Sequence, residues 1–225
     1  MKRLLILLVL PLFFGILQAQ KTKKQTIKFT QAWVWEYENN LIAENEPGHK
    51  GEIVVYFEPK QNYWLFTSEA FGNSGEMYNW IIGKPDGTYV LNASDEFGYT
   101  KLMIEKLKFS TNKKIPSHYI PVSNKKIFNE NKLGFPKIIG RKYIVDYEKT
   151  TDQSSVYFAD HKVNFSPLYH FNRLNIEAKI PFSFPFDLPE NKLLLEDESI
   201  ITTSKISLVF KEISNTEYFV EINDK

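Results

Sequence analysis

The sequence predicts a mainly β (α+β) protein, in which one or two short helices pack across a large curved antiparallel sheet or half-barrel. Aromatic residues make up 15% of the 225 residues, and such residues favour strands. Apolar residues also alternate with polar ones in many segments, and short turns join these segments, as in antiparallel sheets. A sheet of about ten strands must twist and curl. A closed barrel or a two-sheet sandwich is the alternative.

The first 19 residues are typical of a signal peptide. Lys2 and Arg3 precede the apolar run Leu4–Leu17, and Ala19 is the small residue expected at a cleavage site. The run contains Pro11 and is shorter than the ~20 residues of a spanning helix. We therefore expect a soluble protein without a stable membrane anchor, exported to the periplasm or to the extracellular space.

Residues 20–225 are expected to form a single antiparallel β-rich domain built of two halves, with the connection near residues 111–136. The sequence contains no cysteine, so the domain has no disulfide bonds, and a chain of this length can bury a sufficient core without them. Without Lys2 and Arg3, 26 of the 28 basic residues remain against 27 acidic ones. This balance argues against a nucleic-acid partner, since such proteins need a concentrated basic surface.

The first strands are predicted from alternation and from turns. Thr26–Glu38 alternates strictly except at Gln31, which predicts a half-buried strand. Two hairpins follow between Gly51 and Asn92, with turns at residues 59–62 and 84–87 that contain Pro59, Pro85 and Gly87. Alternate residues of these hairpins form one apolar face, which comprises Ile53, Val55, Phe57, Trp64, Phe66, Tyr78, Trp80, Ile82, Tyr89 and Leu91.

The spacing of Leu102, Met103 and Leu107 predicts a helix over Thr100–Phe109. Such a short helix is marginal alone, so we expect it to pack on the aromatic face. Residues 111–136 show little periodicity. Further strands are predicted within residues 137–148, 154–159, 193–196, 200–211 and 217–222, and the proline-rich residues 181–189 are expected to form an apolar plug or an edge segment.

The order of these features resembles the lipoprotein-carrier (LolA-like) fold. More narrowly, Ile138-Ile139-Gly140-Arg141-Lys142-Tyr143 followed by Val156-Tyr157-Phe158 is similar to the second half of exported bacterial GLPGLI-type proteins. Those proteins carry an I-x-G-Y/R-K-C strand and then a W-Y-T strand, and Tyr143 stands at the position of their cysteine. The resemblance implies a periplasmic or outer-surface binding protein rather than an enzyme.

The polar residues show no recognisable catalytic, metal-binding or cofactor-binding motif, so we expect none of these sites. His161 and His170, with Asp160 adjacent, lack the close spacing of typical metal ligands. His49 and His118 are expected in loops without a recognisable partner. A hydrolase with paired carboxylates is the least favoured function, because the acidic groups Glu44/Glu46, Asp95/Glu96 and Glu196/Asp197/Glu198 lie in polar turns or at strand ends.

The aromatic residues are the remaining functional signal, and they form either a packed core, the lining of an apolar cavity, or an exposed platform for carbohydrate. The candidate cavity lining comprises Trp33, Trp35, Trp64, Phe66, Trp80, Tyr89, Leu102 and Met103. We therefore predict a non-enzymatic protein of the cell envelope that binds or carries an apolar, lipid-like molecule. The alternative is a protein–protein interaction module, with a fully packed core, that binds an envelope protein.

Overall fold

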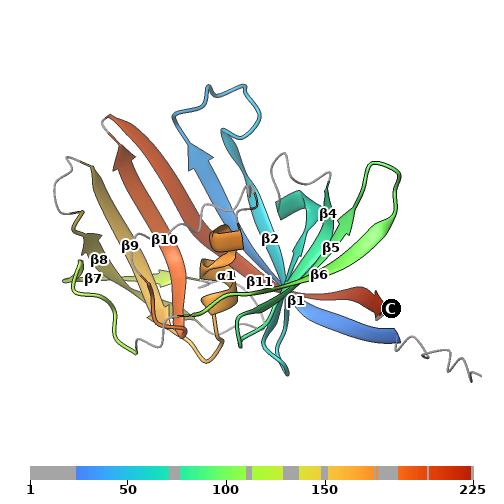
Figure 1. Cartoon of the computed structure of the whole chain (residues 1–225). Helices are drawn as coiled ribbons and strands as arrows, with labels where there is room; N and C mark the ends of the chain where they lie inside the picture. Colours follow the sequence, from blue (N-terminus) through green and yellow to red (C-terminus); the bar gives the residue numbers. More distant parts are fainter. Residues whose placement is uncertain are drawn as a thin grey trace, which may run out of the picture. The chain divides into compact units, whose positions relative to one another are not determined.

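A computed structural model describes residues 24–70, 77–109, 113–128, 137–147, 152–174, 176, 187–201 and 203–223. In these residues, eleven strands form one antiparallel sheet that is not closed (Figure 1). The predicted mainly β class is confirmed, and the closed barrel and the two-sheet sandwich are wrong. The predicted signal peptide, and residues 181–186 of the proline-rich segment, lie outside the described residues.

The strand order is β6-β5-β4-β3-β2-β1-β11-β10-β9-β8-β7. The chain therefore runs from the central strand β1 to the edge strand β6, continues at the opposite edge with β7, and returns to the centre with β11. The strands are β1 (Lys24–Asn39), β2 (Lys50–Glu58), β3 (Tyr63–Thr67), β4 (Tyr78–Gly83), β5 (Thr88–Ser94), β6 (Thr100–Lys106), β7 (Tyr119–Phe128), β8 (Ile138–Val145), β9 (Gln153–Asp160), β10 (Lys192–Ile201) and β11 (Ser204–Asn223).

The chain divides into two compact units. Of the described residues, the smaller unit contains residues 24–27 and 220–223, and in it Lys24 Nζ lies 2.7 Å from a carboxylate oxygen of Glu221. The larger unit is Lys28–Phe219. All the features discussed below belong to the larger unit.

The prediction of a helix over Thr100–Phe109 is wrong, because Thr100–Lys106 forms the edge strand β6. The preceding turn explains the difference. The side chain of Asp95 accepts hydrogen bonds from the backbone N–H groups of Phe97 and Tyr99, at 3.0 and 2.8 Å, and Gly98 has a φ of +81°. This turn returns the chain alongside β5, where backbone pairing provides more hydrogen bonds than a short isolated helix could retain.

Residues 111–136, which were expected to connect the two halves and show little periodicity, contain β7. This strand pairs with β8 alone, its register shifts between Pro121 and Lys125, and most of its residues are exposed. A strand at a sheet edge needs neither a continuous ladder nor an apolar face, so its sequence carries no clear period.

The helical segment that covers the sheet is α1 (Ser166–Tyr169), followed by the 3-10 turn η3 (Phe171–Leu174). Figure 1 shows α1 lying across one face of the sheet. The side chain of Asn164 accepts a hydrogen bond from Ser166 N at 2.8 Å, and Pro167 lies in the first turn, where proline is tolerated. This segment, residues 164–174, is called the cover below.

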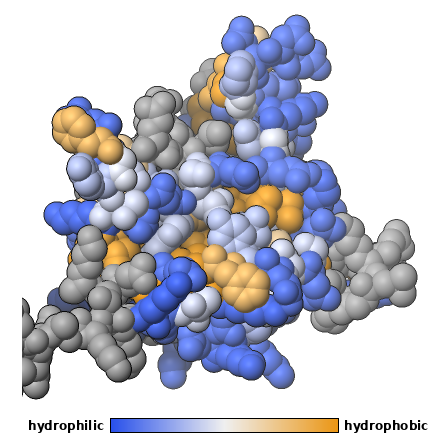
Figure 2. All heavy atoms as spheres, turned by 90° about the vertical axis from the view of Figure 1, so that its right-hand side faces the viewer, coloured by the Kyte–Doolittle hydropathy of each residue, from blue (hydrophilic) through white to orange (hydrophobic). Residues whose placement is uncertain are grey.

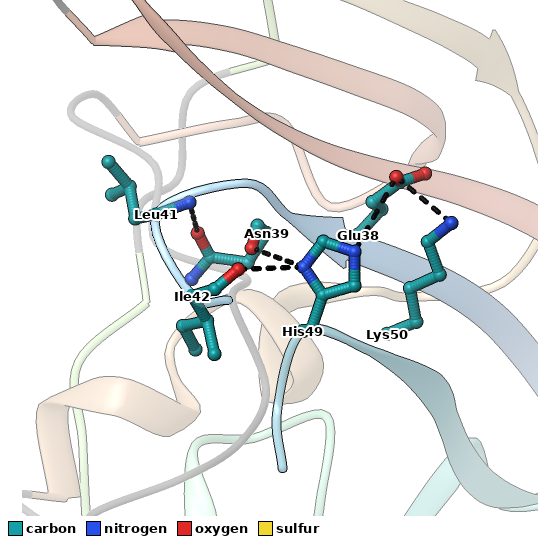
Figure 3. Close-up of polar contacts among 6 residues, drawn as sticks. All are labelled: Glu38, Asn39, Leu41, Ile42, His49 and Lys50. Atoms are coloured by element: carbon teal, nitrogen blue, oxygen red, sulfur yellow. Dashed lines mark hydrogen bonds and ion pairs between the residues drawn. The ribbon is translucent and has the colours of Figure 1, made fainter. Parts of the chain in front are cut away.

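His49 organises the loop between β1 and β2 (Figure 3). Its ring is buried, and its Nδ1 lies 3.1 Å from the carbonyl oxygen of Asn39 and 2.8 Å from that of Ile42. Because both partners are acceptors, Nδ1 carries the proton. The expectation that His49 has no partner is therefore wrong.

Candidate functional site

Trp33 is the centre of the aromatic cluster in the larger unit. Its side chain is 1% exposed. The ring centroids of six residues lie 5.5–6.3 Å from it. One residue belongs to the same strand, three belong to other strands, and two belong to the segment that leads into and begins the cover: Trp35; Phe57, Trp64 and Phe210; His161 and Phe165. These spacings are typical of packed aromatic pairs, which add to the stabilisation from area burial.

The cover contacts both halves of the sheet through hydrogen bonds as well as rings. Trp64 donates its indole N–H to the carbonyl oxygen of Asn164 at 2.8 Å, and Tyr89 donates its hydroxyl to that of Pro167 at 2.7 Å. On the other side, the Tyr169 hydroxyl donates to Lys192 O and accepts from Leu194 N. Burial raises the pKa of both tyrosines, which keeps their hydroxyls protonated as donors.

Five of the eight predicted lining residues lie together in this cluster, namely Trp33, Trp35, Trp64, Phe66 and Tyr89, and Met103 packs against it. They are packed against neighbouring side chains. Phe66, for example, lies 4.3 Å from the ring of Phe171 in the cover. Sequence analysis missed the cover residues, because a single helical turn has no detectable period.

Trp80 and Leu102 do not share this face, so their predicted placement there is wrong. Trp80 lies opposite Thr67 on the neighbouring strand, so the two side chains share a face of the sheet. The next residue to Thr67, Phe66, belongs to the cluster, and successive side chains point to opposite faces, so Trp80 points away from the cluster. A register shift between Tyr78 and Trp80 places Trp80 on the face opposite to the predicted one. Leu102 is opposite Asn92, whereas Met103 is opposite the buried Leu91.

The histidines near the cover make local contacts. His161 Nδ1 accepts a hydrogen bond from Val163 N at 3.2 Å, and His170 Nδ1 lies 2.9 Å from the carbonyl oxygen of Ser166. Burial lowers the pKa of both rings, which favours neutral imidazoles. Within the described residues, no group of three His, Cys, Asp or Glu side chains is positioned to hold a metal ion.

One of the acidic groups considered for a hydrolase, Glu196/Asp197/Glu198, has structural partners. Glu196 pairs with Lys126, and Glu198 pairs with Lys205. Asp197 is different, because it is partly buried and accepts hydrogen bonds from Ser154 Oγ at 3.0 Å and from Ser199 Oγ at 3.4 Å. Its burial raises its pKa to about 6, an effect that the two serine hydroxyls oppose.

Asp197 therefore predicts a dependence of stability on pH. Its pKa of about 6 in the folded protein exceeds the ordinary value of about 3.9, which means that the folded state favours the neutral carboxyl. The stability that the neutral carboxyl contributes to the folded protein is fully present below about pH 4 and is lost as the pH rises through 6. We expect Asp197→Asn to raise the free energy of unfolding by about 2 kcal/mol at pH 7.5, with the gain shrinking towards pH 4. Urea unfolding at both pH values measures this difference. The matched control, Glu44→Gln in an exposed loop, should show no such pattern, and a loss of stability in Asp197→Asn at pH 7.5 would contradict the assignment.

Two pockets in the larger unit are open to solvent. A groove of about 380 Å³ is lined by Glu36, Tyr37, Glu38, Lys50, Gly51, Glu52, Ser207 and Val209. A smaller pocket of about 170 Å³, called the basic pocket below, is lined by Lys125, Ile139, Arg141, Tyr143, Phe158, Ala159, Asp160 and Lys192. Neither was predicted from the sequence.

Hydrophobic residues reach the surface at several separate places between hydrophilic ones on the side of the molecule that Figure 2 shows. No helix among the described residues is long and apolar enough to span a membrane.

No protein family has a model that matches this chain, and no curated protein matches it.

Proposed function

We propose that this protein is an exported, non-catalytic binding protein of the cell envelope that carries an apolar, lipid-like ligand on the aromatic face of its sheet. One observation carries the proposal: aromatic side chains from β1, β3, β5 and β11 converge beneath the cover, a segment of only eleven residues. Sites for apolar ligands are lined by such side chains, and a few polar groups fix the orientation of the ligand.

The ligand would reach this face by displacing the cover. The four-residue helix α1 is far too short to persist alone, so it depends on its contacts with the sheet. Local segments of a folded protein can open at a lower free energy than the strands of its core. The hydroxyl and indole donors of Tyr89 and Trp64, which now bind the cover, would then be available to the polar end of a ligand.

A second function, a protein–protein interaction module, is favoured by the packing and by the edge hairpin β7–β8. The candidate lining residues Trp35, Trp64 and Phe66 are fully buried, as expected for a packed core. The hairpin exposes two cross-strand isoleucine pairs, Ile120 with Ile144 and Ile127 with Ile139. Exposed apolar pairs at a sheet edge suit a protein partner.

Hydrogen–deuterium exchange with and without decanol separates these functions. If the ligand displaces the cover, decanol should accelerate exchange of the α1 amides at Leu168, Tyr169 and His170, which now bond within the cover. The amides of the β10–β11 pair between Glu198 and Ile201 serve as the internal control and should not change. Unchanged exchange in α1, together with the absence of decanol binding, would leave the interaction module as the function.

A further inference from the structure

The basic pocket contains more positive charge than its own carboxylate can balance. Three cations, Lys125, Arg141 and Lys192, line it with a single carboxylate, Asp160. Asp160 already forms an ion pair with Lys192. Among the residues that the structure describes, neither Lys125 nor Arg141 has an ion pair.

The strand register places these two free cations side by side. Lys125 of β7 is the direct cross-strand partner of Arg141 of β8. Like charges at directly opposed positions of a sheet destabilise the pairing. The register shift of β7 ends at Lys125, and such bulges re-aim side chains next to functional sites. The fold thus places two cations together where an anion could bridge them.

The floor of the basic pocket is apolar and continuous with the core. Phe158 is the partner of Arg141 on β9, and its ring lies 5.8 Å from that of Tyr143 and 5.7 Å from that of Tyr119. Ile139, which is 60% exposed, lines the same pocket. Cationic side chains and apolar surface therefore occur within one pocket.

The larger groove does not offer this combination, because its charges are compensated. Lys211 lies 2.7 Å from Glu36 and also pairs with Glu52. Lys50 lies 3.1 Å from Glu38. An added anion would meet three carboxylates there.

We propose that the basic pocket binds an oxyanion, a carboxylate or a phosphate, and that this group is the head of an amphipathic ligand whose chain continues along Ile139 and the aromatic floor. The pocket volume of about 170 Å³ is below the ~300 Å³ of pockets that enclose drug-sized ligands, so it suits a head group rather than a whole lipid. Arg141 binds the two oxygens as a fork, and Lys125 adds a second charge. The part of this inference that concerns the apolar chain of the ligand rests on the proposed function. The anion site for the head group does not depend on it.

Isothermal titration calorimetry at low ionic strength, where charge interactions are least screened, tests the proposal with three probes: decanoate, decanol and inorganic phosphate. We expect decanoate to bind at least about tenfold more tightly than decanol, and we expect Arg141→Gln or Lys125→Gln to weaken decanoate binding about tenfold. The matched control is Lys142→Gln, which removes the same charge at the position next to Arg141. Lys142 lies over the ring of Tyr157 and does not line the pocket.

The outcomes distinguish the two proposals. If only phosphate binds, and Arg141→Gln abolishes this binding, the anion site is retained but its ligand is a free anion. Because neither decanoate nor decanol binds in that case, the proposed carrier function is overturned. Equal binding of decanol and decanoate, unchanged in the variants, would overturn the anion site and leave the carrier function in place. If none of the three probes binds, both proposals are wrong.

Discussion

Trp33→Ala is expected to cause the largest loss of stability, about 4 kcal/mol in the free energy of unfolding. The side chain is 1% exposed, and rings from three other strands and from the region of the cover surround it, so its removal leaves a cavity that they cannot close. Urea unfolding followed by far-UV circular dichroism measures the effect. A retained unfolding midpoint would mean that Trp33 is not at the centre of the packed cluster.

Trp80→Ala is the matched control for this prediction. Both tryptophans alternate within predicted strands, but Trp80 points away from the cluster and remains partly exposed. We expect its replacement to cost about 1–2 kcal/mol. Similar losses in the two variants would contradict the assignment of Trp80 to the opposite face.

Gly87→Ala is expected to have the second largest effect, about 3–4 kcal/mol. Gly87 has a φ of +86°, and an added Cβ would lie 2.0 Å from the carbonyl oxygen of Leu107. The backbone cannot easily move away, because Gly87 N donates to Lys84 O at 3.1 Å and Gly87 O accepts from Leu107 N at 2.9 Å. The substitution should therefore disturb both the β4–β5 turn and the chain that follows β6. Thermal unfolding measures this loss.

Gly98→Ala separates the backbone strain from the clash. Gly98 has a similar φ of +81°, but nothing lies within 4 Å of an added Cβ. Only the cost of the left-handed conformation remains, about 1–2 kcal/mol. If Gly87→Ala costs no more than Gly98→Ala, the chain after β6 does not pack against the turn as described.

The regular strands could be predicted from the sequence, because large apolar residues recur at alternate positions along them. In β1, Trp33 and Trp35 lie on the predicted face, opposite Val55 and Ile53 of β2. The edge strands could not be predicted in the same way. In β6, the apolar residues Leu102 and Ile104 lie on the side opposite Met103, and Ile104 is 72% exposed, so the apolar spacing imitates a helix.

The candidate site was predicted only in part, since its missing components depend on contacts between distant segments. One inserted residue near Asn79 turned Trp80 to the other face, and alternation alone cannot detect such a bulge. The cover consists of a single helical turn, whose only local signal is the Asn-Phe-Ser-Pro sequence at 164–167. Lys125, Arg141 and Lys192 come from three strands, and only the register places them in one pocket.

Native mass spectrometry would detect a bound apolar ligand on the protein itself. The protein would be purified without organic solvent from the cells that produce it, and its mass would be compared before and after extraction with organic solvent. If the protein carries an apolar ligand, we expect the mass of a co-purifying ligand that extraction removes. Decanoate should then rebind to the extracted protein. A bare polypeptide mass before extraction, with no uptake of fluorescent fatty acids, would contradict the carrier function and favour an interaction module.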